Sequence, residues 1–208
     1  MTGLIGRKVG MTRMFDEDSG RAVAVTIIQA GTNIVHQVKT AERDGYRAVQ
    51  LGFEPVADTA CAKPQAGHFK KLGTEPTRYV KEFAADDNDE ELKPGQKVGV
   101  EIFENVQYVD VVGISKGRGF AGTIKKHNFQ LGRATHGNTN HRERGSLGAG
   151  TYPGRVFPGV KMAGQYGAAR TTAKKLEVYD VDKELGLVYV KGSVPGSTRG
   201  IVYIKKNI

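Results

Sequence analysis

Lysine and arginine side chains are concentrated in one segment, residues 115–170, where they could bind phosphate groups. The 208-residue chain has 31 Lys and Arg and 22 Asp and Glu, a net charge of +9. Residues 115–170 hold ten of these cations and a single acid, Glu143, so the rest of the chain has 21 of each and is neutral. Surface charge that serves only solubility is usually mixed in sign, so this asymmetry predicts contact with nucleic acid. The ten cations are Lys116, Arg118, Lys125, Lys126, Arg133, Arg142, Arg144, Arg155, Lys161 and Arg170.

The same segment, which we call the arm, is rich in glycine. It holds 12 of the 28 glycines and few large apolar residues. A backbone without Cβ can approach a phosphate closely and offer its N–H. No run in the arm has the period of a strand or a helix, and its apolar surface is too small to offset the entropy of ordering. We therefore expect an arm that is mobile alone and becomes ordered when nucleic acid packs around it.

Three histidines in the arm, His127, His136 and His141, raise the question of a metal site. A zinc site needs four ligands, and the only carboxylate in the arm is Glu143, with no cysteine near. We therefore interpret the histidines as nucleic-acid contacts and expect no metal and no cofactor. Aromatic residues of the arm could stack on unpaired bases or anchor the arm's base, and the sequence leaves both open. They are Phe120, Phe129, Tyr152, Phe157 and Tyr166.

Two enzyme motifs overlap at the start of the arm. Residues 117–122 read GRGFAG, a match to GxGxxG, and residues 113–117 read GISKG, a match to GxSxG. A dinucleotide site needs a following helix with an apolar face, and a nucleophile elbow needs the same strand–turn–helix unit. The residues that follow, TIKKHNFQLG, are polar and interrupted by glycine. We therefore predict that the chain is not an enzyme; the alternative is a nucleotide-binding enzyme that uses the GRGFAG loop.

The elements that must position the arm are short strands on both sides of it. Each half is too short for a good core, so residues 1–114 and 171–208 are predicted to form one β-barrel. Residues 54–90 should form a small mixed α/β element at its side. That element includes a helix that starts near Pro64 and ends at Gly73, and an acidic solvated loop at 86–91. The expected strands are 11–15, 21–29, 33–39, 46–53, 78–83, 98–103, 107–114, 175–181, 185–191 and 201–205.

Composition also limits the setting of the protein. No run approaches 18 consecutive apolar residues, so no membrane span is expected. The single cysteine, Cys61, cannot form an internal disulfide or a cysteine zinc cluster. A reducing cytoplasm is the expected location.

Several long motifs resemble the bacterial family of large-subunit ribosomal protein L-three. They are GLIGRKVGMTRMFDEDSG, DGYRAVQLGF, AGHFKKLG, VDVVGISKGRGFAGTIKKHNF, ATHGNTNHRERGSLGAGTYPGRVFPGVKMAGQYG and VKGSVPGS. The resemblance implies a translation-protein-type β-barrel with a long basic internal extension. It also implies a ribosome-bound protein that binds 23S rRNA near its 3′ end, early in assembly of the large subunit. The arm would then extend toward the peptidyl transferase centre, and ribosomal proteins L-fourteen and L-nineteen would be neighbours.

The resemblance also places the tip of the arm and reveals one difference there. Some family members carry a methylated glutamine before a Thr-Pro-Gly sequence at the tip. This chain has Thr151 at the matching place, followed by Tyr152, so that modification is expected to be absent. The expected tip residues are Ser146, Leu147, Gly148, Ala149, Gly150, Thr151, Tyr152 and Pro153.

Overall fold

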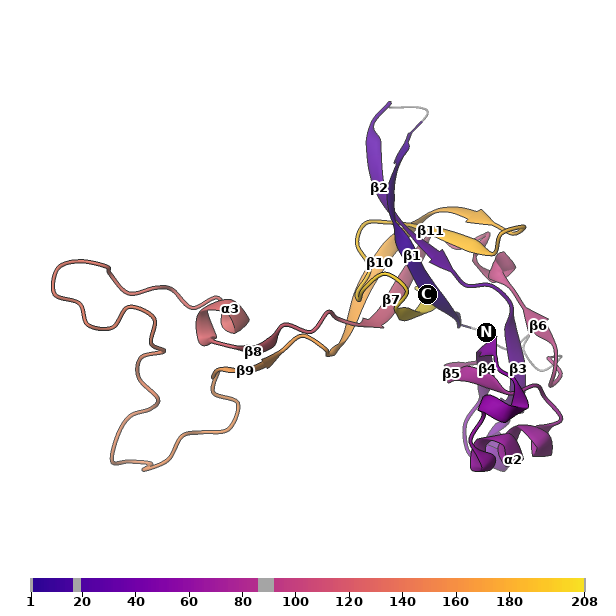
Figure 1. The fold of residues 1–208 in the computed structure, drawn as a ribbon, viewed down its shortest axis with the longest axis horizontal. Coiled ribbons are helices and arrows are strands. Elements are labelled where there is room, and N and C mark those ends of the chain that lie inside the picture. Colours follow the sequence, from indigo (N-terminus) through magenta and orange to yellow (C-terminus); the bar gives the residue numbers. More distant parts are fainter. Residues whose placement is uncertain (1, 17–19, 86–91, 208) are drawn as a thin grey trace. The chain divides into compact units, whose positions relative to one another are not determined.

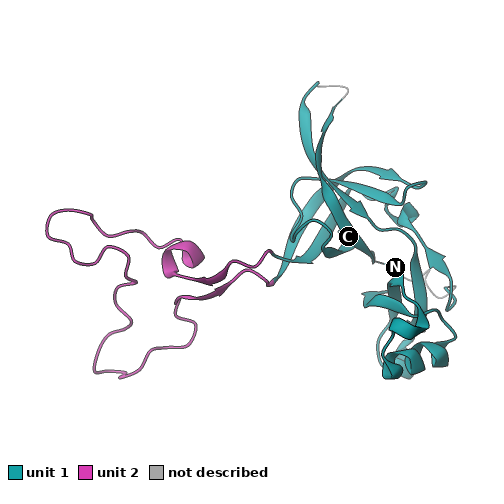
Figure 2. Ribbon diagram, in the orientation of Figure 1, with its two compact units in different colours: residues 1–115, 170–208 teal, residues 116–169 magenta. Residues whose placement is uncertain are grey.

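The computed structural model of the chain describes residues 2–16, 20–85 and 92–207. The acidic run at 86–91, expected to be a solvated loop, lies outside the described residues. The chain divides into two compact units (Figure 2), a globular unit of residues 1–115 and 170–208 and an arm unit of residues 116–169.

The globular unit contains a closed barrel of six antiparallel strands in the order β1-β12-β7-β10-β11-β2 (Figure 1). This confirms the mainly β, barrel-type fold predicted from the sequence. Strands from before and after the arm are neighbours in the barrel, with β7 lying between β12 and β10, so neither half closes alone. The barrel strands are β1 (Gly3–Phe15), β2 (Ala22–Gln29), β7 (Tyr108–Ile114), β10 (Arg170–Asp182), β11 (Leu187–Lys191) and β12 (Ile201–Lys206).

The first strand is much longer than the segment 11–15 that the sequence pattern predicts. β1 starts at Gly3, pairs with β12 over residues 3–7, and pairs with β2 over residues 7–15. Glycine usually weakens a strand, so the sequence pattern does not predict a strand in the glycine-containing segment before Met11. Here Gly3 is needed, because a Cβ at this position would overlap the carbonyl oxygen of Ile204 in β12.

A second, four-stranded antiparallel sheet in the order β5-β4-β3-β6 lies in the same unit. The sequence pattern assigns only residues 54–90 to a side element, whereas this sheet begins at Asn33. Its strands are β3 (Asn33–Lys39), β4 (Ala48–Pro55), β5 (Thr77–Ala84) and β6 (Lys97–Val98). The helical elements of this region are α1 (Ala41–Asp44), η1 (Asp58–Ala60), α2 (Lys63–Leu72) and η3 (Val100–Phe103).

Two of these helical elements test local predictions. The helix expected near Pro64 is confirmed: α2 has proline in its first turn and ends at Gly73, whose left-handed backbone donates its N–H to the last turn. The strand expected at 98–103 is wrong, because only Val98 continues β6 and η3 follows it. A 3₁₀ turn has three residues per turn, so it points Val100 and Phe103 into the core together, and both are buried.

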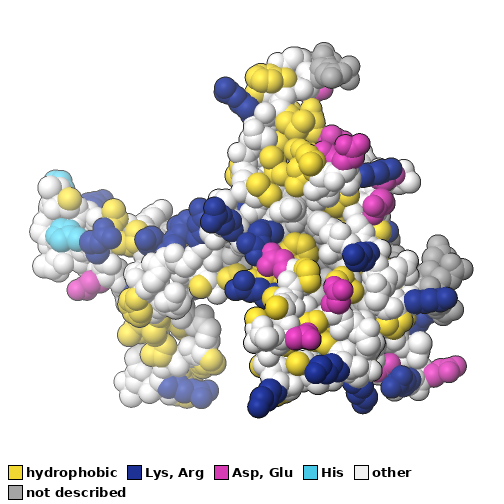
Figure 3. All heavy atoms as spheres, turned by 45° about the vertical axis from the view of Figure 1, so that its right-hand side comes forward, with side chains coloured by type: hydrophobic (Ala, Val, Ile, Leu, Met, Phe, Trp, Pro, Cys, Tyr) yellow, Lys and Arg dark blue, Asp and Glu magenta, His cyan; other side chains and the backbone are white. Residues whose placement is uncertain are grey.

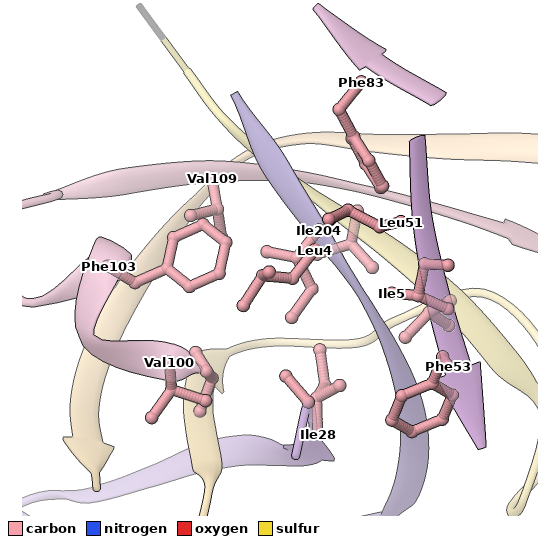
Figure 4. Close-up of a cluster of buried hydrophobic side chains, with 14 of the residues drawn as sticks. Leu4, Ile5, Ile28, Leu51, Phe53, Phe83, Val100, Phe103, Val109 and Ile204 are labelled. Carbon is pink, nitrogen blue, oxygen red and sulfur yellow. The ribbon is translucent and has the colours of Figure 1, made fainter. Parts of the chain in front are cut away.

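One hydrophobic core joins the barrel to the four-stranded sheet (Figure 4). Barrel strands supply aliphatic residues, and the sheet and η3 supply aromatic rings that fill the space between them. Core burial of this kind is the main stabilising contribution to a domain. Its large members are Leu4, Ile5, Ile28, Leu51, Phe53, Phe83, Phe103 and Ile204.

A buried asparagine connects the barrel to the sheet. Asn33, at the start of β3, has no exposed surface. Its Nδ2 donates to the carbonyl oxygens of Ile5 (3.1 Å) and Ala30 (2.7 Å), and the Ile5 N–H donates to Asn33 Oδ1 at 3.1 Å. Ile5 lies before the first β1 residue that pairs with β2. The Asn33 amide therefore takes the place of a neighbouring strand and satisfies the backbone of β1 there.

A buried histidine connects β3 to the segment between α2 and β5. His36 has no exposed surface, its Nδ1 lies 2.8 Å from Thr74 Oγ1, and its Nε2 lies 2.7 Å from Thr77 Oγ1. Its ring packs on Phe69 of α2 with 4.8 Å between centroids. Burial, with a smaller contribution from the charge of His68, lowers the pKa of His36 from 6.5 to about 4.

This pKa predicts a loss of stability in mild acid. Because the folded pKa lies below the unfolded one, the unfolded chain binds more protons between pH 6.5 and 4. The contribution of neutral His36 is therefore complete above pH 6.5 and is lost as pH falls, by about 3 kcal/mol at pH 4. Urea unfolding of the wild type and of His36→Gln, from pH 7 to 4, measures it. The free-energy gap between them should shrink in acid, whereas the gap between the wild type and exposed His136→Gln should not depend on pH. A gap between the wild type and His36→Gln that is independent of pH would contradict the prediction.

Candidate nucleic-acid interface

The base of the arm unit is a short antiparallel ribbon. β8 (Gly119–Ala121) pairs with β9 (Gly164–Tyr166), and the Arg118 N–H extends the ladder by donating to the Tyr166 carbonyl at 2.8 Å. The expectation that the arm has neither strand nor helix is wrong here. The two strands are three residues long and far apart in sequence, so no local hydrophobic period predicts them. The Arg118 guanidinium lies over the Tyr166 ring, 5.1 Å from its centroid.

A single helical turn follows the ribbon. α3 (Thr123–His127) ends at Asn128, which has a left-handed backbone conformation and donates its N–H to the Ile124 carbonyl. His127 Nε2 donates to the carbonyl of Met162 at 3.1 Å, and its ring lies 6.2 Å from that of Phe129. His127 therefore joins the outgoing and returning halves of the arm through its Nε2 atom.

Residues 132–141 form a loop closed by its own hydrogen bonds. The Gly132 N–H donates to the His141 carbonyl at 3.0 Å, and His141 Nδ1 donates to the Arg133 carbonyl at 2.8 Å. Asn138 Nδ2 donates to the carbonyls of Arg133 (2.9 Å) and Asn140 (3.1 Å). A Cβ at Gly132 would overlap the Asn140 carbonyl oxygen. The loop is thus organised by polar contacts within itself, whereas the side chains of Arg133 and His136 are exposed.

The predicted tip residues, 146–153, form bends and turns from Gly148 onward, and all of them except half-buried Pro153 are exposed. Ser146 Oγ donates to the Gly148 carbonyl at 3.0 Å. Leu147 is exposed, and Tyr152 is 89% exposed, the largest value among the exposed large hydrophobic residues described. Thr151, at the place of the family's modified glutamine, is also exposed.

Most predicted cations of the arm are exposed and unpaired. Lys126, His127 and Arg144 are half-buried, and Arg170 lies in the globular unit as the first residue of β10. Among the residues that the structure describes, ion pairs are found in the globular unit and none involves an arm cation. Figure 3 shows the Lys and Arg side chains spread along the arm. The exposed members are Lys116, Arg118, Lys125, Arg133, His136, His141, Arg142, Arg155 and Lys161.

The aromatic residues of the arm divide into two groups. Phe129 and Tyr166 are half-buried, against His127 and Arg118 respectively. Phe120 is 79% exposed, and Tyr152 and Phe157 are exposed as well. The first group therefore packs within the arm. In the second group the Arg155 guanidinium lies over the Phe157 ring, 5.5 Å from its centroid, so Phe120 and Tyr152 are the members with free ring faces among the described residues. Stacking on unpaired bases requires such faces.

The remaining arm group of note is Arg144. Its Nε and Nη1 atoms are enclosed and have no hydrogen-bond partner among the described atoms. A guanidinium offers five donors, so Arg144 keeps unused donor capacity.

The segment that matches enzyme motifs has no enzyme geometry. GRGFAG, residues 117–122, contains β8, and the helix after it, α3, has five residues and no apolar face for a sheet. Within the described parts of the chain, no three His, Cys, Asp or Glu side chains cluster as metal ligands. None of the helices described is long and apolar enough to span a membrane.

The barrel and the arm together define a class of protein: a β-barrel that carries a cationic, glycine-rich extension suited to a polyanion. Comparison with known proteins is more specific. Residues 80–186 match the family model described as ribosomal protein L3. The chain is 50% identical over 202 residues to large ribosomal subunit protein uL3 of Crocosphaera subtropica, covering 97% of this chain and 95% of that one.

Other relatives give the same result. The proteins of that name from Azoarcus sp. and Thermotoga petrophila are 50% and 49% identical, and the matches cover 99% of this chain and 98% and 97% of theirs. The chain belongs to the ribosomal protein L3 family. This confirms the resemblance found in the sequence motifs.

Proposed function

We propose that this chain is a structural, non-enzymatic constituent of the large ribosomal subunit, ribosome-bound in the cytoplasm, and that its arm binds 23S rRNA. Family membership supports the ribosomal role, because the relatives carry the name large ribosomal subunit protein. The observation that carries the RNA-binding part is the arm itself. It presents nine exposed Lys, Arg and His side chains, and in the described structure no carboxylate pairs with its cations.

The physics of the arm favours folded RNA over a sequence-specific duplex site. Phosphate contacts from Lys and Arg supply affinity and position without reading sequence. Exposed rings such as Phe120 and Tyr152 suit unpaired bases, which folded RNA presents in loops and bulges. The backbone of the arm is held by hydrogen bonds within loop 132–141 and by the β8–β9 ribbon, so few of its cations are needed to maintain its own shape.

The finer proposal follows the family resemblance. The rRNA contact lies near the 3′ end of 23S rRNA and forms early, so that the protein nucleates assembly. The tip, residues 146–153, extends toward the peptidyl transferase centre, and ribosomal proteins L-fourteen and L-nineteen are neighbours. Any effect on peptide-bond formation is indirect, through the shape of the surrounding rRNA, because the tip side chains provide no activated nucleophile or base.

Deleting the arm should separate folding from binding. Replacing residues 119–164 by a short Gly-Ser linker removes none of the buried core cluster. The melting temperature should therefore change by only a few degrees, about the shift of a small surface change. Binding to a transcript of the 3′ half of 23S rRNA should fall by at least about a hundredfold, because most phosphate contacts are removed.

Each result bears on a separate claim. Thermal unfolding by circular dichroism tests folding, and filter binding tests affinity. A deletion variant that unfolds would show that the arm supplies core, contrary to the division into two units. A folded variant that binds the transcript as the wild type does would show that the arm is not the RNA-binding site.

A further inference from the structure

The neutrality of the chain outside the arm conceals a second basic region. Residues 63–81 contain five cations and one acid, Glu75, whereas the run at 86–91 contains five acids. These opposite segments cancel in the total, although the cations of the first belong to α2 and β5. The cations are Lys63, Lys70, Lys71, Arg78 and Lys81, and all five are exposed.

A groove lies between α2 and β5 in the globular unit. It has a volume of about 490 Å³ and is lined by residues of both elements. β5 is the outer strand of the four-stranded sheet, so the groove opens at the edge of that sheet. Figure 3 shows Lys and Arg side chains gathered at the lower end of the globular unit, the end at which Figure 1 places α2. We call it the α2–β5 groove; its lining is Pro64, Gln65, His68, Phe69, Thr77, Arg78 and Val80.

The groove combines an apolar base with cations at its rim. Phe69 is buried beneath it and Val80 is partly exposed, so its floor has flat and aliphatic surfaces. Arg78 lines one side, 5.6 Å from the Tyr79 ring centroid. On α2, Lys71 follows His68 by three residues and therefore lies on the same side of the helix. A planar, uncharged group fits the floor, and an anion fits the rim.

The nearby carboxylates do not neutralise this rim. Glu82, on the same face of β5 as Arg78 and Val80, is bound by Lys39 Nζ at 2.8 Å and accepts a hydrogen bond from Tyr46 at 2.8 Å. The bond from Lys39 is the main reason that the pKa of Glu82 is lowered, so it remains charged and engaged there. Glu75 lines a different hollow together with Lys70. Lys63, Lys71 and Arg78 are therefore left without a carboxylate partner among the described residues.

We propose that the α2–β5 groove binds an unpaired nucleotide of RNA, as a second RNA contact distinct from the arm. The base would stack on His68 and contact Val80, and Lys71 and Arg78 would contact the flanking phosphates. Base stacking on an aromatic face and phosphate contact by neighbouring cations is the usual combination for single-stranded RNA. The inference rests on the proposed function, since it takes the RNA to be the one that the arm binds.

A matched pair of charge variants tests the groove in the full-length chain. The groove variant is Lys63→Gln, Lys71→Gln and Arg78→Gln. The control variant is Arg43→Gln, Lys183→Gln and Lys191→Gln, which removes equal charge beside carboxylates: Lys183 pairs with Glu104 at 2.7 Å and Lys191 with Glu177 at 3.1 Å, and Arg43 lies between two acids in α1. Melting temperatures verify that both variants are folded.

Binding is measured with the 23S rRNA 3′-half transcript at several salt concentrations. The groove variant should bind about tenfold or more weakly, and its log–log salt slope should be shallower by about two. The control variant should change affinity by less than about twofold, because its three cations lie beside carboxylates and outside the groove. His68→Ala should weaken binding by about fivefold or more with an unchanged salt slope, as expected for lost stacking.

The outcomes separate this inference from the proposed function. Equal affinity of the groove and control variants, while arm deletion abolishes binding, would overturn the groove and leave the arm in place. Loss of binding in the groove variant with normal binding after arm deletion would support the groove and overturn the arm. An unchanged affinity accompanied by loss of a co-purifying protein would also overturn the inference, because the occupant would then be a protein.

Discussion

Replacing six exposed arm cations by glutamine should make rRNA binding far less sensitive to salt. Each phosphate neutralised by a protein cation contributes about −0.7 to −0.9 to the log–log slope of affinity against salt. Six lost contacts should make the slope shallower by about four to five. Between 50 and 200 mM salt, the affinity of the variant should therefore fall by a factor that is several hundredfold smaller than the fall for the wild type. Filter binding to the 23S rRNA 3′-half transcript measures this. The six substitutions are at Arg118, Lys125, Arg133, Arg142, Arg155 and Lys161.

The physical reason is that these side chains contribute little to the fold; in the described structure two of them pack on rings within the arm, Arg118 on Tyr166 and Arg155 on Phe157. They are exposed, and none is held in an ion pair. Thermal stability should therefore remain that of the wild type. A control for charge lost outside the arm is the three-site variant with Arg43, Lys183 and Lys191 changed to glutamine, whose slope should change by less than about one. A six-site variant with the wild-type slope would refute phosphate binding by the arm.

Removing the Asn33 amide should destabilise the globular unit more than any single arm substitution. Asn33→Leu keeps the approximate size but leaves the Ile5 N–H and the carbonyls of Ile5 and Ala30 without the partner that they now have. Each buried backbone group left unsatisfied costs about 1–3 kcal/mol, so the loss in unfolding free energy should reach about 3 kcal/mol or more. Urea unfolding should show a lower midpoint with an unchanged slope.

A second asparagine provides the comparison. Asn207 is exposed and donates to Asp110 Oδ1 at 3.1 Å on the surface. Asn207→Leu should change the unfolding free energy by less than about 0.5 kcal/mol, as surface substitutions usually do. If the two variants were equally stable, the view that Asn33 replaces a missing strand beside β1 would be incorrect.

The fold class could be predicted because its signals are local. Alternating apolar residues mark β2 and β7, and Pro64 and Gly73 mark the two ends of α2. The parts that were missed depend on distant partners. β1 contains Gly3 because the β12 backbone approaches it, and η3 forms because Val100 and Phe103 share one core. Nothing within either segment specifies those neighbours.

In the arm, too, some features could be predicted from composition, whereas others depend on contacts between distant residues. Its cations were found by charge alone, since a count needs no structure. The β8–β9 ribbon and the closed loop 132–141 were not, because their hydrogen bonds join residues that share no period. The roles of Phe129 and Tyr166 in packing within the arm also required the structure.

The α2–β5 groove was missed for a different reason. A net charge of zero outside the arm suggested an evenly balanced surface, but the positive residues 63–81 and the acidic run 86–91 cancel only in the sum. Charge counted over a window of about twenty residues, rather than over a whole domain, would have identified the basic region.

Crosslinking of the protein to RNA in cell extract, followed by sequencing of the attached RNA, is the most direct test of the central claim. We expect crosslinks from arm residues to 23S rRNA, clustered near its 3′ end and around the peptidyl transferase centre. Recovery of a bound nucleotide at the GRGFAG segment, with no crosslinked rRNA, would contradict it.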